Sequence, residues 1–303
     1  MKKYFLPLLL IFAQVISARA ATFSSGITQI LGKNEYRGRS VFFDYQNELG
    51  WFLQPAYFSA KDSIGPDTSL YMVSAGRDKT GRHFYFDGFI LPETDGYSRF
   101  GFSGALSAPV WKTGDAAVEL DGALRQTVHQ DKKGYDIISG QRAVTDRTDP
   151  QKTGQLDVQA GIVVRKGIWR GGARYMHSFY TSSPDPMDRA AIRTYLDGIA
   201  PAVSGFPNQL WGFRADCRPM PEFKPYASFT TAQLKQDLRT LYAWEIGAVS
   251  SVKLWHFRAA YSILRQSGGT NASYFIAGAT FSFDYPADAE GAVRRQAGQM
   301  EGD

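Results

Sequence analysis

The sequence predicts an all-β protein, folded as a transmembrane, antiparallel, up-and-down β-barrel of about fourteen strands. Three observations carry this prediction. Segment after segment alternates apolar and polar residues one position at a time, as strands with one oily and one wet face do. After residue 21 no apolar stretch is long enough for a spanning helix. Aromatic residues make up 14% of the chain and glycines number 30, while the mean hydropathy is only -0.28. Such a composition suits a barrel whose apolar side chains face outward.

The first element, residues 1–20, is predicted to be a cleavable Sec-type signal peptide. Lys2 and Lys3 give a positive start, an apolar run extends from Phe5 to Ile16, and Ala18-Arg19-Ala20 forms a small-x-small cleavage site. The alternative is an uncleaved membrane anchor, but the apolar run is shorter than the ~20 residues of a spanning helix.

Charge and cysteine content exclude several classes of function. The formal net charge is +5, and removal of Lys2, Lys3 and Arg19 with the signal leaves about +2, too little to predict a nucleic-acid partner. The single cysteine, Cys217, rules out an intramolecular disulfide framework and a cysteine-built metal site.

Fourteen strands can be marked along the mature chain. In the clearest of them Leu120 and Leu124 fall on one face, and Glu119, Asp121 and Arg125 on the other. Alternation is poor before Gly50 and around Tyr226, so twelve is the alternative count. The expected strands are Thr22 to Ile30, Arg37 to Gln46, Gly50 to Ala60, Thr68 to Arg77, Arg82 to Leu91, Tyr97 to Pro109, Ala116 to Val128, Gln155 to Arg165, Ile168 to Tyr180, Gln209 to Asp216, Lys224 to Leu234, Thr240 to Ser250, Leu254 to Arg265 and Ala272 to Asp284.

The connections between these strands segregate by length. Counting back from the last strand, every second connection is short, and the two long insertions, His129 to Gly154 and Thr181 to Asn208, fall at the other end. Bacterial barrels have short periplasmic turns and longer extracellular loops. We therefore expect both insertions to be extracellular loops, the second with a helical pattern at residues 187–199 that could narrow the mouth or contact a partner.

Aromatic residues gather near strand ends, as in the girdles that barrels place at the two membrane interfaces. The residues in question are Trp51, Tyr71, Tyr97, Trp111, Trp169, Tyr175, Phe179, Trp211, Tyr242, Trp244, Trp255 and Tyr285.

The last strand resembles the closing strand of Gram-negative outer-membrane proteins, with Phe275, Phe281, Phe283 and Tyr285 on one face. The resemblance is to that architecture, across nearly the whole mature chain, and no particular family is recognised. It implies an outer-membrane location, contact with outer-membrane lipid and folding by the barrel assembly machinery. The domains expected are a signal peptide (1–20), the barrel (21–285) and a polar periplasmic tail (286–303), whereas such proteins usually end at the terminal aromatic.

Charged side chains of both signs are expected to face the interior. The basic residues Arg170, Arg174 and Arg214 would lie opposite acidic residues such as Glu119 and Asp121. A transverse field of this kind favours small polar solutes, so the sequence predicts a channel for small hydrophilic or charged solutes, with a link to saccharides. If the charges instead pair across the interior, they form a plug in a non-conducting structural or surface barrel. The expected lumen-lining residues are Arg99, Glu119, Asp121, Arg125, Asp157, Arg170, Arg174, Arg214, Asp216, Glu245 and Arg258.

A lipid-acting barrel enzyme is the minor alternative. Barrel phospholipases and lipid A deacylases resemble one another in a His-x-Ser pair on a strand, which places base and nucleophile on one face. Here His177 and Ser178 are adjacent and would point to opposite faces. The stretch Asp146 to Pro150 lacks the ligands of a calcium loop and is expected to be a solvated turn. No catalytic residue, metal or cofactor is predicted, and nothing in the sequence predicts the oligomeric state.

Overall fold

The computed structural model describes residues 21–32, 35–47, 49–61, 67–79, 82–94, 96–138, 141–182, 206–235, 240–267 and 271–283. The expected signal peptide (1–20), the end of the closing strand with the tail (284–303), and the helical pattern at 187–199 lie outside these residues. No helix among the described residues is long and apolar enough to cross a membrane.

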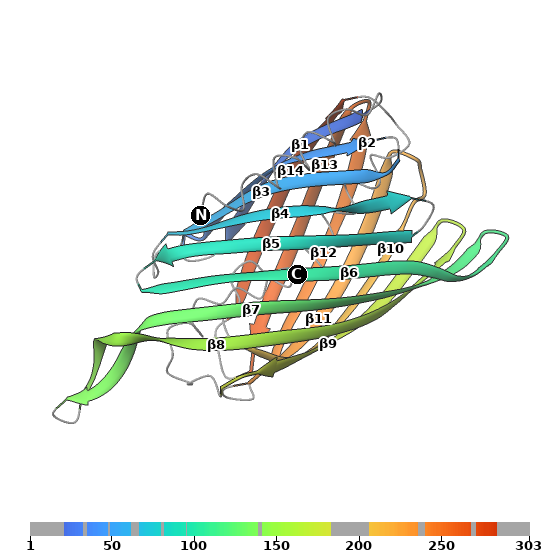
Figure 1. The fold of residues 1–303 in the computed structure, drawn as a ribbon. Coiled ribbons are helices and arrows are strands. Elements are labelled where there is room, and N and C mark those ends of the chain that lie inside the picture. The colour runs from blue at the N-terminus through green and yellow to red at the C-terminus, as the bar shows by residue number, and fades with distance from the viewer. Residues whose placement is uncertain are drawn as a thin grey trace.

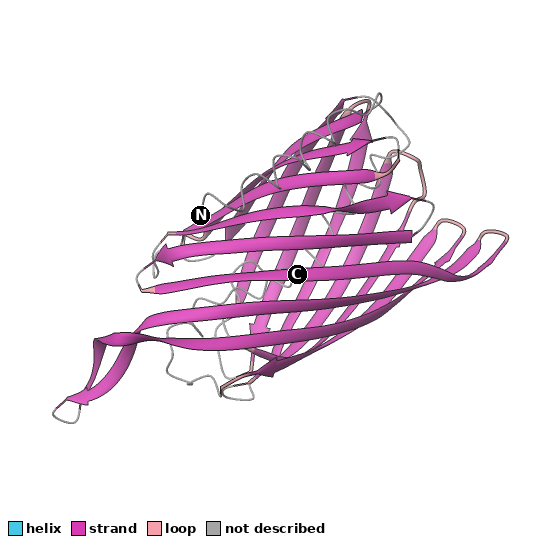
Figure 2. Cartoon of the chain, in the orientation of Figure 1, coloured by secondary structure: helices cyan, strands magenta, loops and turns pink. Residues whose placement is uncertain are grey.

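Fourteen antiparallel strands close into one barrel, as predicted (Figure 1). Every described element is a strand (Figure 2), and the ring closes where β1 pairs with β14, with Phe23 opposite Phe283. The strands are β1 (Ala21–Gly32), β2 (Arg37–Asn47), β3 (Trp51–Lys61), β4 (Thr68–Lys79), β5 (Arg82–Thr94), β6 (Tyr97–Thr113), β7 (Ala116–Ile138), β8 (Gln141–Lys166), β9 (Trp169–Tyr180), β10 (Pro207–Cys217), β11 (Phe223–Leu234), β12 (Thr240–Val252), β13 (Trp255–Gln266) and β14 (Ala272–Phe283).

The two ends of the barrel differ in their connections. At the end where β1 begins and β14 ends, all six connections are between two and five residues long, and we call it the short-turn end. Gly114 and Gly167 occupy two-residue turns there with φ of 57° and 56°, a conformation that glycine adopts without steric cost. The opposite end, the long-loop end, carries the connection between β9 and β10, which spans residues 181–206.

The outer face of the barrel carries the apolar half of each alternating strand. Phe102, Leu106, Leu124 and Ile246 are between 57% and 71% exposed, in the middle stretches of β6, β7 and β12. A continuous apolar exterior on a closed barrel requires lipid as its surroundings, because monomeric soluble proteins do not expose apolar surface on that scale. The transmembrane β-barrel architecture expected from the sequence is confirmed, and the outer-membrane location stays a prediction.

Aromatic side chains mark both ends of this exterior. Trp111, Trp169 and Trp255 are exposed near the short-turn end, and Trp211 and Tyr242 near the long-loop end. Tyr97, which was expected in a girdle, instead faces inward and is almost completely buried. Tyr97 is the first residue of β6, and its side chain already belongs to the inner face of that strand.

The prediction of a loop from His129 to Gly154 is wrong. Strands β7 and β8 stay paired through this segment, from Asp131 opposite Gln151 to Ile138 opposite Gln141, with a register shift between Asp131 and Lys133. The hairpin projects beyond the barrel wall (Figure 1, green). Asp146 to Pro150, expected to be a turn, therefore belongs to β8.

Candidate functional site

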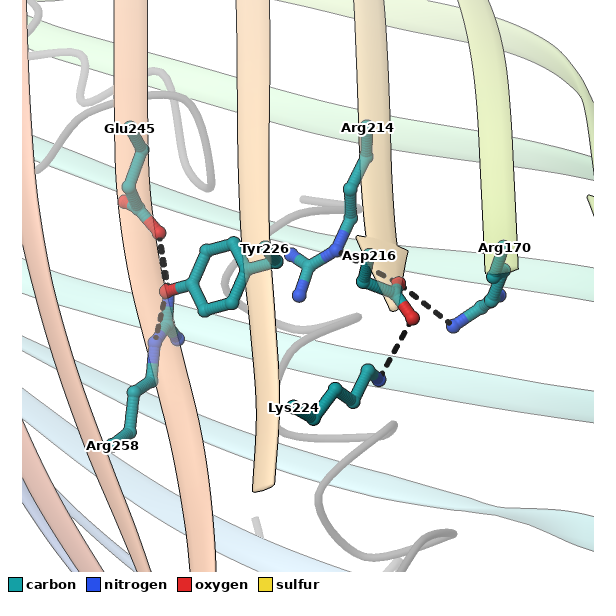
Figure 3. A network of polar contacts seen from close by, with 7 residues as sticks. All are labelled: Arg170, Arg214, Asp216, Lys224, Tyr226, Glu245 and Arg258. Atoms are coloured by element: carbon teal, nitrogen blue, oxygen red, sulfur yellow. Dashed lines mark hydrogen bonds and ion pairs between the residues drawn. The ribbon is translucent and has the colours of Figure 1, made fainter. Parts of the chain in front are cut away.

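A network of charged side chains lies on the inner face of β9 to β13, toward the short-turn end (Figure 3). Asp216 on β10 is its first centre. The Asp216 carboxylate lies 3.6 Å from Arg214 Nε, 3.6 Å from Lys224 Nζ and 4.0 Å from Arg170 Nη1. One carboxylate on β10 thus attracts cations from β9, β10 and β11.

Tyr226 on β11 is the second centre of the network. Its hydroxyl accepts a hydrogen bond from Arg258 Nε at 2.9 Å and donates one to Glu245 Oε1 at 2.7 Å. Arg258 Nη2 also donates to Glu245 Oε1, at 2.7 Å. The Arg214 guanidinium lies 4.1 Å from the centroid of the Tyr226 ring, which is within cation–π range. Tyr226 therefore connects the ion pair on β12 and β13 with the cations around Asp216.

A glycine makes room for the Tyr226 ring. A Cβ atom at Gly247 on β12 would lie 2.6 Å from Tyr226 Cζ and 2.8 Å from the carbonyl oxygen of Ala259. Gly161 on β8 plays the same part for Asp121, because a Cβ there would lie 2.4 Å from the Asp121 carboxylate. Register across β7 to β9 places Gly161 between Asp121 and Arg174, so the long side chains lie over a bare backbone position.

The sequence predicted that the acidic residues of β7 lie opposite the basic residues. In the structure they do not lie on the opposite wall. Glu119 forms an ion pair with Arg165 of β8 at 3.0 Å. Asp121 lies close enough to Arg174 and Arg170 to interact with both electrostatically. These acids lie on β7, only two strands from β9 in the ring, and so form one charged wall with the bases.

A row of polar side chains crosses the inner face of β3 to β7. Paired positions run from Gln54 to Ser74, then to Asp87 and Ser103, and on to Arg125. Ser103 donates a hydrogen bond to Asp87 Oδ2 at 3.0 Å. Gln54 is 0% exposed, and its amide has no hydrogen-bond partner within the described part of the chain. Because β3 and β10 are seven strands apart in a ring of fourteen, this row lies across the barrel from the network.

Nearer the long-loop end, four buried side chains form a hydrogen-bond relay. Gln155 Nε2 donates to both Asp157 oxygens, at 2.8 and 3.0 Å, so its Oε1 is left to accept from His129 Nε2 at 2.9 Å. His129 Nδ1 then accepts from the Tyr97 hydroxyl at 2.8 Å. This tautomer is inferred from the bonding pattern, and it satisfies every polar group of the relay in a buried setting.

Beside this relay, the inner face toward the long-loop end carries two apolar clusters. Leu210, Leu234, Leu241 and Leu264 belong to one buried cluster that also includes Tyr226. On the other wall Leu70, Leu91 and Tyr97 form a second cluster with Phe206, the residue that precedes β10. Phe206 is 0% exposed and lies 5.0 Å from the His129 ring and 5.6 Å from the Tyr180 ring, centroid to centroid.

The eleven residues expected to line the lumen fall into these groups. Arg170, Arg214, Asp216, Glu245 and Arg258 belong to the network, and the other six lie beside it or on β6 to β8. Arg99 and Arg125 both lie over the Phe89 ring, Asp157 ends the relay, and Glu119, Asp121 and Arg174 belong to the charged wall of β7 to β9.

Lys224, Tyr226 and Gln54 are among the members of the site that sequence reasoning missed. Lys224 and Tyr226 lie on β11, whose alternation is poor, and Gln54 carries no charge. The available signal was a polar residue two positions from another inward residue on the same strand, as Gln54 is from Phe52.

The positions of two histidine–serine pairs test whether the barrel could hold a catalytic base and nucleophile. Ser178 is buried, while the ring of His177 packs on the exposed Phe179 at 4.7 Å, so the two lie on opposite faces of β9 as expected. Strand pairing brings together a different pair: Ser251 Oγ and His256 Nδ1 are 2.8 Å apart, across the turn between β12 and β13. Within the described residues no three His, Cys, Asp or Glu side chains come together as a metal site.

No family model and no curated protein matches the chain. The chain is similar to several solved structures. These include outer membrane protein OprD from Pseudomonas aeruginosa (7% identity, TM-score 0.46, 88% of this chain and 94% of that one) and CdiB from Acinetobacter baumannii (11%, 0.47, 87% and 60%). A third is a loop-deletion mutant of OmpT, an outer membrane protein of Vibrio cholerae (10%, 0.45, 87% and 99%). Likenesses this distant carry no argument about function, and the fold rests on the strand pairing above.

Proposed function

We propose that the barrel is an outer-membrane channel for small charged solutes. The supporting observation is which strands the ion pairs of the network join. Arg258 with Glu245, Lys224 with Asp216, and Arg170 with Asp216 all join adjacent strands. Charges paired in this way line the wall, whereas a plug needs pairs that bridge the interior.

The distribution of charge supports the same proposal. Asp44 and Asp87 lie on the inner face of β2 and β5, and the cation Arg214 lies on β10, six and five strands away from them in the ring of fourteen. Opposed charges along a narrow passage create a transverse field that orients polar solutes and excludes apolar ones. We infer that solutes pass between the polar row and the network. A link to saccharides, and folding by the barrel assembly machinery, remain predictions from the sequence.

Planar-bilayer conductance tests the channel. Purified, folded protein should give discrete conductance steps, and the double variant Arg170→Ala/Arg174→Ala should shift the reversal potential toward cation preference. Arg39→Ala, an exposed outer-face substitution, is the matched control and should leave ion preference unchanged. Folded wild-type protein that gave no conductance at any voltage would refute the open-channel proposal.

A non-conducting barrel is the second candidate, and the Phe206 cluster favours it. Phe206, at the start of β10, belongs to one buried cluster with Leu70 and Leu91 of the opposite wall. If this contact seals the barrel, wild-type protein should be silent and Phe206→Ala should open it. Conductance steps of equal size in both proteins would remove this candidate.

A lipid hydrolase is the third candidate, and its only support is the Ser251–His256 contact. A serine nucleophile needs a base and a group that orients the base. In the described part of the chain no carboxylate contact of His256 is found. Loss of phospholipid hydrolysis in Ser251→Ala, compared with a hydrolysing wild type, would support an enzyme, and a blank wild-type assay would exclude it.

A further inference from the structure

We propose that the C-terminal segment, residues 284–303, returns into the barrel from the short-turn end and docks on the inner face of β1 to β5, where its two arginines meet Asp44 and Asp87. The docking can be tested without any conductance. Its consequence for solutes rests on the proposed channel, because a docked segment narrows that passage on its acidic side.

The inner faces of β14 and of β1 to β5, together called the acidic face, hold acids but no strong base. Asp44 and Asp87 are 3% and 4% exposed, and Asp78 lies 2.6 Å from His83 Nδ1. Among the described inward positions of these six strands there is no lysine or arginine, whereas the inward cations named above all lie on β6 to β13. Buried carboxylates are normally accompanied by a cation, so a basic group from elsewhere in the chain fits here.

The inward arginines of the barrel wall lie at least three strands from Asp44. Asp87 receives hydrogen bonds from Ser74 and Ser103, and Arg125 of β7 acts on it electrostatically. Asp44 lies on β2, and the nearest strand with an inward arginine is β13, three strands away in the ring, or about 14 Å at ~4.8 Å per strand. An arginine that enters from the short-turn end therefore approaches Asp44 and leaves the ion pairs of the wall intact.

Gln54 gives an independent sign of a further contact on the acidic face. Its side chain is 0% exposed, yet neither the nitrogen nor the oxygen of its amide has a hydrogen-bond partner within the described residues. The register of β2 on β3, with Tyr45 opposite Leu53, places Gln54 opposite Asp44. A buried amide is expected to be hydrogen-bonded, and a backbone segment lying across Gln54 supplies both a donor and an acceptor.

The acidic face begins where the described part of the chain ends. Ser282 on β14 pairs with Ser24 of β1, with their hydroxyl oxygens 3.1 Å apart, and Ser24 pairs with Asp44. Five steps between neighbouring strands lead from β14 to β5, about 24 Å at ~4.8 Å per step. Arg294 follows Phe283 by eleven residues, which reach about 36 Å when extended. The C-terminal segment is therefore long enough for its arginines to meet either carboxylate.

The charges of the C-terminal segment allow this approach. Arg294 and Arg295 are its two basic residues, and five acids flank them. The nearest acids, Glu290 and Glu301, are four and six residues from the pair. Four extended residues span about 13 Å, which exceeds the Debye length of about 8 Å at physiological salt. The arginine pair can therefore reach a carboxylate without bringing the acids of the segment against it.

Disulfide trapping in folded protein tests the docking. In a Cys217→Ser background, Gln54→Cys is combined with Ala292→Cys or with Arg294→Cys, the protein is oxidised, and linked peptides are identified by mass spectrometry. Because a disulfide needs Cα atoms within about 7 Å, we expect at least one of the two combinations to link. Gly88→Cys, on the outer face with nothing within 4 Å of its Cβ, replaces Gln54→Cys in the matched control and should link to neither.

The loop between β9 and β10 is the other segment that trapping must distinguish. Arg193→Cys places a cysteine in this loop, which joins strands across the ring from β3. A link from Gln54→Cys to Arg193→Cys, with none to residues 284–303, would overturn the proposal. Ser74, opposite Gln54, is the second test position, and absence of any link to the C-terminal segment from both Gln54→Cys and Ser74→Cys would also overturn it. Heat-modifiable migration on a gel checks folding.

Trypsin reports on the two arginines themselves. Cleavage after Arg294 or Arg295 removes a short C-terminal peptide, which intact-mass measurement of the folded protein detects. We expect the double variant Asp44→Asn/Asp87→Asn to be cut about tenfold faster than wild type, because the arginines lose their charge-assisted hydrogen bonds. Glu93→Gln changes an exposed acid that pairs with Lys132, and as the matched control it should be cut as slowly as wild type. Equal rates in all three proteins would overturn the charge pairing, and either single variant suffices if the double variant does not fold.

Removal of residues 286–303 separates the docking from the proposed channel. Removal uncovers the acidic face, so conductance steps should grow and the reversal potential should shift toward cation preference. Disulfide links in a protein without conductance would keep the docking and refute the channel. Conductance with neither links nor protection from trypsin would keep the channel and overturn the docking. Unchanged conductance after the removal, in a protein whose full-length form does link, would overturn the narrowing of the passage.

Discussion

Tyr226 joins the two halves of the charged network at the scale of a single residue. Its hydroxyl bridges Arg258 and Glu245, and its ring receives Arg214. Tyr226→Phe keeps the ring but leaves Arg258 Nε without this acceptor, so we expect a loss of about 1–2 kcal/mol in the free energy of unfolding. Urea titrations followed by tryptophan fluorescence in detergent micelles measure it.

The matched control is Tyr261→Phe, which removes a hydroxyl from the exposed outer face of β13. Its free energy of unfolding should lie within about 0.5 kcal/mol of that of wild type. Equal midpoints for Tyr226→Phe and Tyr261→Phe would mean that the bridging hydroxyl contributes no net stability.

Gly247 is required by the close approach of Tyr226. A Cβ at 2.6 Å from the tyrosine and 2.8 Å from the Ala259 carbonyl forces either the ring or the strand to move. We expect Gly247→Ala to cost about 1–3 kcal/mol of unfolding free energy, as overpacking does. Gly88→Ala, with open space at its Cβ, should cost nothing. The same urea titration compares the two, and equal stability would contradict the packing argument.

At the scale of the element, strands with a polar inner face were predictable and strands with an apolar one were less so. Alternation identified β7 because Glu119 and Asp121 face inward while Leu120 faces lipid. Around β11 the pattern blurs, because Tyr226 and Leu234 are buried on the inner face. A strand that is apolar on both faces loses the period of two, although its length still fits.

In the β7–β8 hairpin, the sequence predicted a loop where the structure has two paired strands. Beyond Asp131 and Gln151 the two strands pair only with each other, since neither β6 nor β9 extends that far. A two-stranded ribbon that pairs with no third strand does not require alternation of apolar and polar residues. A polar stretch of this kind is indistinguishable from a loop until the hydrogen bonds are known.

The projecting part of the hairpin should be dispensable for folding. Replacing residues 133–150 with Asn-Gly leaves Asp131 paired with Gln151 and closes the strands with a short turn. We expect the same heat-modifiable migration and the same urea midpoint as wild type, because all contacts between β7 and β6 and between β8 and β9 remain. A folding defect would show that the hairpin stabilises the barrel.

For the molecule as a whole, the sequence indicates which residues face inward but not which of them meet. Periodicity places Arg214, Asp216 and Arg258 on one face of their strands, and the eleven expected residues follow from that rule alone. The contact between Lys224 and Asp216, or between Ser251 and His256, depends on strand register and turn length. Register is a property of the closed sheet, so the network could not be assembled residue by residue.

The lipid-facing exterior makes a prediction about depth. Leu124 is exposed near the middle of β7, and Val110 is exposed on β6 close to the short-turn end. An arginine at the bilayer centre costs about 2–4 kcal/mol, and one near the interface about 0–1 kcal/mol. In lipid vesicles, Leu124→Arg should therefore reduce the free energy of unfolding by the larger amount and Val110→Arg by the smaller. In detergent micelles, whose polar surface is closer, the two losses of unfolding free energy should become similar. Equal losses in vesicles would mean that the apolar belt is not centred on the bilayer as the girdles of tryptophan indicate.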